Sequence, residues 1–310
     1  MVGGSRRSMR AAVGSVVAVV AVVASACGGA DHGSSGSSPT SPSSPTSSER
    51  SYGAQVVLPF TNVHTPEAVA VDSSGNLYVA DQTVLKLAAG SSTQTVLPFP
   101  GTFIWHGVAV DGSGAVYAAG INGSNAGRVL KLAAGAAAAT ELPFTGFSAN
   151  VDSAVVWVGL AVDAAGNVYV SDSMANRVFK LAAGSFASTV LPFTGLSNPE
   201  RVAVDGAGNV YVVDNQNNRV VELPQGSSDQ RVLPFTGLNN PHGVAVDSAG
   251  AVYVVDSENN RVLKLAAGST TQVVLPFTVK NPHGVAVDGS GNVYVTDVGT
   301  GGRVLKLPVK

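Results

Sequence analysis

The sequence is poor in several residue types, and each shortage excludes a class of protein. Among 310 residues there is one cysteine, Cys27, so no disulfide can form within the chain. Only 12% of the residues are charged, and 18 Lys and Arg nearly balance 20 Asp and Glu. A chain with so little positive charge lacks the basic surface that nucleic-acid binding requires. We therefore expect no nucleic-acid partner.

A pattern of about forty residues repeats from residue 56 to the end of the chain. Each copy has an Ala-Val-Asp run, a Gly-x-Val/Leu-Tyr run, a Val-x-x-Leu run and, in most copies, a Leu-Pro-Phe triplet. Four short runs rich in Val, Tyr, Leu and Phe, separated by turn residues, are typical of antiparallel strands. An array of such units predicts an all-β, six-bladed β-propeller over residues 55–310. The aspartates that mark the six copies are Asp72, Asp111, Asp163, Asp205, Asp247 and Asp288.

The position of the Leu-Pro-Phe triplet predicts how the ring closes. One triplet, at residues 58–60, precedes the first Ala-Val-Asp run, and none follows the last unit. Residues 56–60 should therefore complete the sixth blade beside residues 303–307, which leaves no open edge in the ring. Because proline removes a hydrogen-bond donor from the ladder, the strand that carries the triplet should be the outer edge of its blade.

Two further features of the repeat predict structural roles. Each marker aspartate opens an Asp-x-x-Gly turn, where its carboxylate can accept backbone N–H groups. Six of the seven tyrosines lie in the second strand of a copy, and six of the ten phenylalanines close a Leu-Pro-Phe triplet. One tyrosine and one phenylalanine per copy favour packing between blades.

Residues 1–27 have the composition of a lipoprotein signal peptide. Three arginines precede an uncharged Ala/Val-rich stretch of 16 residues, 11–26, which is shorter than the roughly 20 residues that span a bilayer. The stretch ends in Ala-Ser-Ala before Cys27 and resembles a bacterial lipobox, in which the cysteine is acylated. We expect an exported protein on the outer face of the cytoplasmic membrane or in the cell wall, held by lipid alone; the Sec and twin-arginine routes both stay open.

Residues 28–54 are mostly Ser, Thr, Pro and Gly. A segment with so few apolar residues cannot offset the entropy of ordering, so we expect a disordered tether. Ser and Thr beside Pro also permit glycosylation, which the sequence leaves open.

Several runs carry a family resemblance. Asn-Pro-His-Gly-Val-Ala-Val-Asp at 281–288, Gly-Asn-Val-Tyr-Val-Thr-Asp at 291–297 and Asn-Asn-Arg-Val at 217–220 resemble the NHL repeat. The runs Val-Leu-Pro-Phe-Thr-Gly-Leu and Leu-Lys-Leu-Ala-Ala-Gly resemble the sequences of the extracellular sensor propellers of mycobacterial receptor Ser/Thr kinases. The kinase motifs do not occur in this sequence. The resemblance implies a propeller fold and extracytoplasmic binding.

Titratable residues recur five positions before the marker aspartates, where the chain enters the innermost strand of each blade. In propellers these positions surround the mouth of the central channel. Three histidines and two glutamates there could ligate a zinc-like ion. The alternative, which we favour, is that Pro-His-Gly belongs to the repeat and its imidazole hydrogen-bonds a neighbouring blade. We therefore expect no cofactor, although a divalent metal in the channel stays open. The residues at this position are Glu67, His106, Val158, Glu200, His242 and His283.

Both tryptophans interrupt the repeat. Trp105 and Trp157 replace the proline of the other four copies, and the loop at 145–157 makes the third copy the longest. Long loops on a rigid scaffold often carry binding residues. The aromatic side chains either form a ligand-binding rim or cover the longer loops, and the sequence leaves both open.

We expect a monomeric, non-enzymatic binding or sensor module whose partner is a small molecule, a glycan or a protein of the cell envelope. Two alternatives are a metal-dependent lyase or lactonase at the channel mouth and an adhesion or scaffold module. No Gly-x-Ser-x-Gly elbow occurs, which disfavours serine hydrolase chemistry. The candidate ligand-binding residues are Trp105, His106, Trp157, Glu200, His242 and His283.

The lipid anchor can be tested directly. Cys27→Ala should abolish acyl incorporation and release the protein from the membrane fraction, because residues 11–26 are too short to anchor it securely. Radiolabelled palmitate and fractionation measure both effects. A variant that still pellets with membranes after a high-salt wash would contradict the lipoprotein prediction.

Overall fold

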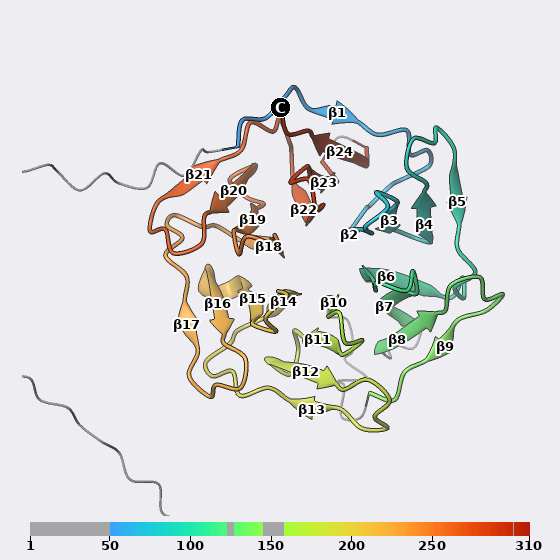
Figure 1. Ribbon diagram of the computed structural model, residues 1–310, viewed down its shortest axis with the longest axis horizontal. Helices are drawn as coiled ribbons and strands as arrows, with labels where there is room; N and C mark the ends of the chain where they lie inside the picture. Colours follow the sequence, from blue (N-terminus) through green and yellow to red (C-terminus); the bar gives the residue numbers. More distant parts are fainter. Residues whose placement is uncertain (1–49, 123–126, 145–157, 300) are drawn as a thin grey trace, which may run out of the picture. The chain divides into compact units, whose positions relative to one another are not determined.

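The described residues form six four-stranded antiparallel sheets, arranged as blades around a central channel (Figure 1). The computed structural model describes residues 50–122, 127–144, 158–299 and 301–310. The predicted signal peptide with Cys27 and nearly all of the predicted tether lie outside these residues. The predicted all-β, six-bladed propeller is confirmed. In the described ranges, no helix is long and apolar enough to cross a membrane.

The strands follow the repeat, blade by blade, from the innermost to the outermost. Blades one to three contain β2 Ala68–Val71, β3 Leu77–Ala80, β4 Val84–Leu87 and β5 Gln94–Val96; β6 Phe103–Val110, β7 Val116–Asn122, β8 Gly127–Leu132 and β9 Thr140–Glu141; β10 Leu160–Val162, β11 Val168–Asp172, β12 Arg177–Leu181 and β13 Thr189–Val190. Blades four to six contain β14 Pro199–Val204, β15 Val210–Asp214, β16 Arg219–Leu223 and β17 Arg231–Val232; β18 Pro241–Val246, β19 Val252–Asp256, β20 Arg261–Leu265 and β21 Gln272–Val274; β22 Pro282–Val287, β23 Val293–Asp297, β24 Arg303–Leu307 and β1 Val56–Val57. A 3-10 turn, η1 Asn215–Asn217, follows β15.

The N-terminal strand closes the ring, as predicted. β1 pairs antiparallel with β24, and the Leu58 N–H continues the ladder by donating to the Val304 carbonyl at 2.9 Å. Pairing begins before the predicted end of the tether at residue 54, because Tyr52 bridges to Val309 and the Gly53 N–H donates to Pro308. These bonds satisfy the edge that blade six would otherwise expose.

The outer strands end at the residue before each Leu-Pro-Phe triplet. After β5, the Leu97 N–H still donates to the Val84 carbonyl at 2.9 Å, but Pro98 has no donor and the Phe99 N–H turns back to the Leu97 carbonyl at 2.8 Å. The triplet therefore follows the outermost strand of the blade, which confirms the predicted edge and corrects its length. The phenylalanine then packs against the hydrophobic cluster between blades.

Each marker aspartate makes the predicted turn contacts and one contact that the repeat did not reveal. The Oδ1 atom of Asp72 accepts the N–H groups of Ser74 and Asn76, at 3.0 and 2.9 Å. Its Oδ2 atom accepts the Tyr78 hydroxyl at 3.0 Å. All six blades repeat this tyrosine contact at 2.8 to 3.0 Å, and burial together with the bond raises the pKa of each tyrosine. The bond gives a hydrogen-bond partner to a tyrosine hydroxyl that is buried beside the hydrophobic clusters.

Removing the closing strand should destabilise the whole ring. A chain that begins at Asn62 lacks β1 and should lose several kcal/mol in the free energy of unfolding, because blade six gains an open edge. A chain that begins at Ser51 keeps β1 and the Tyr52 bridge, and should unfold near the wild-type midpoint. Urea titration of the two chains measures the difference, and equal midpoints would refute the closure argument.

Candidate functional site

A bulge in the innermost strands directs side chains towards the channel mouth. In blade four, Pro199 pairs with Asp214 and Val202 pairs with Val212, so two residues of β14 lie opposite one residue of β15. The same shift occurs in β18 and β22. Bulges of this kind re-aim the side chains that they carry. The bulged pairs are Glu200 and Arg201, His242 and Gly243, and His283 and Gly284.

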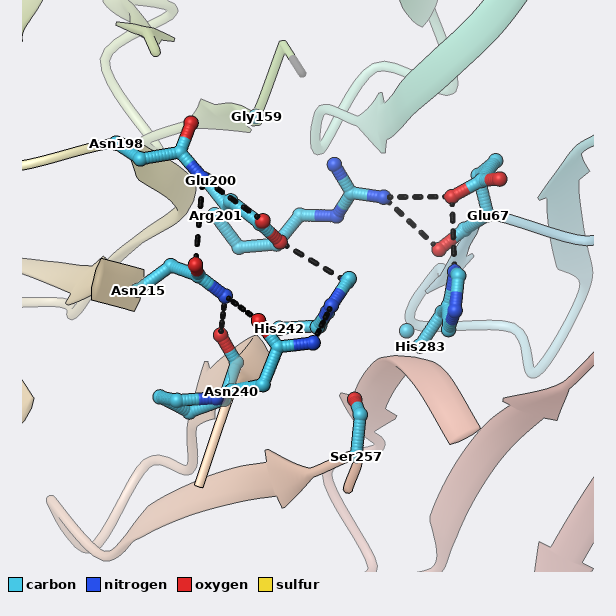
Figure 2. Close-up of polar contacts among 12 residues, drawn as sticks. Glu67, Gly159, Asn198, Glu200, Arg201, Asn215, Asn240, His242, Ser257 and His283 are labelled. Carbon is cyan, nitrogen blue, oxygen red and sulfur yellow. Dashed lines mark hydrogen bonds and ion pairs between the residues drawn. The ribbon is translucent and has the colours of Figure 1, made fainter. Parts of the chain in front are cut away.

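Arg201 is the functional candidate that sequence reasoning missed. It follows the mouth residue of blade four, at the position that is glycine or alanine in the other blades. A Cβ atom on Gly243 would lie 2.5 Å from the carbonyl oxygen of His283, which shows how closely the inner strands approach there. The Arg201 side chain extends into the channel, where it is 7% exposed (Figure 2). The signal in the sequence was Glu-Arg at residues 200–201, where blades five and six have His-Gly.

Arg201 and His283 both reach Glu67 (Figure 2). The Arg201 Nη2 atom lies 3.6 Å from the Glu67 Oε2 atom and donates to the Glu67 carbonyl at 3.0 Å. The His283 Nδ1 atom lies 3.0 Å from the same Oε2. Burial raises the pKa of Glu67, but the His283 hydrogen bond and the charges of His283 and Arg201 outweigh it and lower the pKa. The carboxylate is therefore ionised at neutral pH.

A second histidine–carboxylate pair lies beside the first. The His242 Nδ1 atom is 2.9 Å from the Glu200 Oε2 atom, and the Asn240 amide nitrogen is 3.1 Å from His242 Nε2. The Asn240 amide can donate to Nε2, which leaves Nδ1 as the ring nitrogen that faces the Glu200 carboxylate. The rings of His242 and His283 stack with centroids 4.5 Å apart, so the two pairs form one buried cluster.

The cluster holds two carboxylates and one fixed cation. Burial lowers the pKa of Arg201, and the charges of Glu67 and Glu200 oppose that effect. A guanidinium keeps its proton in proteins, so Arg201 remains a cation between two carboxylates. Burial, with a contribution from Arg201, lowers the pKa of His106 to about 4 against the opposing charge of Glu67. His106 is therefore neutral at pH 7.

The structure places Trp105 in the hydrophobic cluster between blades one and two. Its side chain is 1% exposed, stacks on Phe103 at 4.9 Å and meets Phe99 edge-on at 5.4 Å. This is the packing alternative, and a ligand-binding role for Trp105 gains no support from the described surface. Trp157 lies outside the described residues, and Val158 beside it is fully buried.

The channel is narrow beneath the mouth. A cavity of about 40 Å³ lies below Arg201, lined by valines and by the small residues that follow the mouth positions. Towards the opposite end of the channel, a larger cavity of about 180 Å³ lies between the Val and Ala side chains of the inner strands. In the described part of the chain, no group of three or more His, Cys, Asp or Glu is placed to hold a metal ion. The carboxylates are instead paired with single imidazoles and with Arg201.

Removal of Arg201 tests whether its charge is needed. Arg201→Met should lower the free energy of unfolding by about 3 kcal/mol, because the Glu67 carboxylate stays buried without its cation. Adding Glu67→Gln should recover much of that loss, since the carboxylate that Arg201 contacts is then neutral as well. Urea unfolding at pH 7 measures both.

The matched control is Arg128→Met. Arg128 pairs with Glu141 at the surface, at 2.9 Å with both side chains exposed, and such pairs contribute little. Equal stability of Arg201→Met and the wild type would contradict the buried pair. So would a double variant less stable than Arg201→Met alone.

Comparison with known proteins supports the fold. The NHL repeat family matches residues 196–223, 238–265 and 280–306. No match was found among the curated proteins. The chain is similar to a solved gluconolactonase of Xanthomonas campestris (17% identity, 83% of this chain, 89% of that chain, TM-score 0.65) and to virginiamycin B lyase of Staphylococcus aureus (15%, 84%, 100%, TM-score 0.58).

A chain of the nidogen/laminin complex is also similar, at 20% identity over 72% of this chain and 84% of that chain, with a TM-score of 0.61. At these identities the solved structures establish the fold alone. The NHL matches span blades four, five and six, from the loop before each innermost strand to its third strand. The chain therefore carries NHL repeats within a six-bladed, all-β propeller.

Proposed function

We propose that the protein is an extracytoplasmic, lipid-anchored binding or sensor-type propeller without enzymatic activity, and that its ligand contacts the channel mouth from outside. The lipobox before Cys27 supports the location. The wording of the repeats supports the function, since it resembles the sensor propeller of the mycobacterial receptor kinase PknD. The expected partner is a small molecule, a glycan or a protein of the envelope, bound by a monomer.

The observation that carries this proposal is the position of Arg201. Its side chain lies across the channel to Glu67, and the cavity beneath it holds about 40 Å³. Pockets that enclose a small-molecule substrate are roughly 300 to 1,000 Å³. A substrate therefore has no enclosed site in the described channel, whereas a ligand can contact the mouth from outside, over the buried and stacked His242 and His283.

A metal-dependent lyase or lactonase is the second candidate. It is favoured by the convergence of His283 on Glu67 and of His242 on Glu200, since imidazole and carboxylate are zinc ligands. A lactonase and a lyase among the similar solved structures agree with it at the level of fold. Arg201 opposes it, because a fixed cation beside Glu67 disfavours a second cation there.

Replacement of the stacked histidines separates the two candidates. For a binding module, elemental analysis should find no stoichiometric metal, and a chelator should leave the melting temperature unchanged. The double variant His242→Ala, His283→Ala should then lose only the hydrogen bonds of the two imidazoles, which lowers the free energy of unfolding by roughly 1–3 kcal/mol. The control is His64→Ala, since His64 is an exposed residue of the loop before β2.

Stoichiometric metal in the wild type, lost in the double histidine variant together with a lyase or lactonase activity, would reverse the order of the two candidates. If the wild type holds no metal and the double histidine variant still binds a folded protein partner, the adhesion or scaffold alternative is favoured. That alternative uses a propeller face and does not need the mouth histidines.

A further inference from the structure

Five blades place a lysine ammonium over the tyrosine of the second strand. The lysine lies on the third strand, directly opposite the tyrosine in the register. A cation over a ring face is attracted by the ring quadrupole. In blade two the ammonium also lies 3.8 Å from the marker aspartate. The distances from Nζ to the ring centroid are 5.4 Å for Lys86 and Tyr78, 4.9 Å for Lys131 and Tyr117, 5.2 Å for Lys180 and Tyr169, 5.5 Å for Lys264 and Tyr253, and 5.5 Å for Lys306 and Tyr294.

Blade four breaks this pattern. Glu222 lies opposite Tyr211, in the register position that lysine occupies elsewhere. The Glu222 side chain is 2% exposed, and it accepts two hydrogen bonds of 2.7 Å from Arg231 of the outer strand β17. The Arg231 side chain is 66% exposed, so the pair reaches from the blade interior to the surface.

The substitution changes the local charge. In the other blades one marker aspartate is accompanied by one lysine, and in blade five Arg50 also lies 3.6 Å from Asp247, so the formal sum is zero or positive. In blade four, Asp205 and Glu222 are accompanied by Arg231, which gives a formal sum of minus one. Burial, the bond to Asp205 and the charge of Glu222 all raise the pKa of Tyr211, so it remains a neutral phenol, and the residue as a whole is 5% exposed.

A groove of about 370 Å³ opens beside these residues, between blades four and five. These two blades are neighbours in the ring, β14–β17 and β18–β21 (Figure 1). The volume of the groove lies within the range that small-molecule sites occupy. Blade four supplies a polar wall, and blade five supplies a mainly apolar one. The wall residues that matter here are Asp205, Tyr211, Glu222 and Arg231 on one side, and Val252 and Leu265 on the other.

We propose that this groove binds a small molecule with a primary ammonium group on an aliphatic chain. The ammonium lies over the Tyr211 ring, as the lysine does in the other blades, and the net negative charge of Asp205, Glu222 and Arg231 balances its charge. The aliphatic chain packs against Val252 and Leu265. A compact ammonium fits this position better than a planar guanidinium, because the repeat is built around Lys Nζ. The site is separate from the channel mouth and does not depend on the function proposed for it.

Calorimetric titration of the purified full-length protein with 1,5-diaminopentane tests the proposal. This probe has a five-carbon chain, one carbon longer than the lysine side chain, with an ammonium group at each end, and 1-pentanol has the chain without the charge. The wild type should bind one equivalent of the diamine saturably, weakening as salt is raised, and should not bind 1-pentanol.

The key variant is Glu222→Lys with Arg231→Thr, which restores the Lys and Thr pair of blades one to three. It supplies an internal ammonium, so affinity for the diamine should fall about tenfold or more while the melting temperature is kept. Glu222→Gln keeps the shape of the site, should also weaken binding, and decides the matter if the double variant does not fold. The control is Glu141→Gln, which removes an exposed carboxylate of blade two and should leave affinity unchanged.

Three outcomes would overturn the proposal. The first is no saturable binding of the diamine by the wild type. The second is equal affinity in the wild type and in the restored blade. The third is binding of 1-pentanol as strong as that of the diamine, which would indicate an apolar groove without recognition of charge.

Discussion

The ring is held shut by the pairing of β1 with β24, and the other contacts of the molecule depend on that closure. Each hydrophobic cluster lies between two neighbouring blades, so every blade needs both of its neighbours. The closing strand joins the start of the propeller to its last blade and completes the sixth interface. It also fixes Glu67 of blade one beside His283 of blade six, which forms half of the cluster at the channel mouth.

The channel mouth shows how repeated residues and one exception combine. The bulges of the inner strands deliver His242 and His283 in equivalent positions, so their rings can stack. No other blade has an arginine at the position of Arg201, and its side chain extends to Glu67. Its cation stabilises two carboxylates that burial would otherwise destabilise, and its side chain reduces the open channel. One residue therefore determines both the electrostatics of the mouth and the size of any ligand below it.

Blade four holds three charged departures from the repeat. Arg201 replaces a small residue at the inner strand, Glu222 replaces a lysine at the third strand, and Arg231 lies on the outer strand. The first forms a buried pair across the channel, and the other two form a pair that borders a groove. A blade scaffold needs neither pair, since the other five blades fold without them.

The sequence by itself determined the repeat period, the strands, the turn aspartates and the closure by residues 56–60, because each follows from local patterns and from counting copies. It also predicted that Glu67, Glu200, His242 and His283 approach one mouth. Only the tertiary structure decided which of them pair, that Trp105 is buried, and that Arg201 meets Glu67, 134 residues away. Such contacts depend on the curvature of the ring and on the bulges, which set distances across the channel that no pattern within a single repeat encodes.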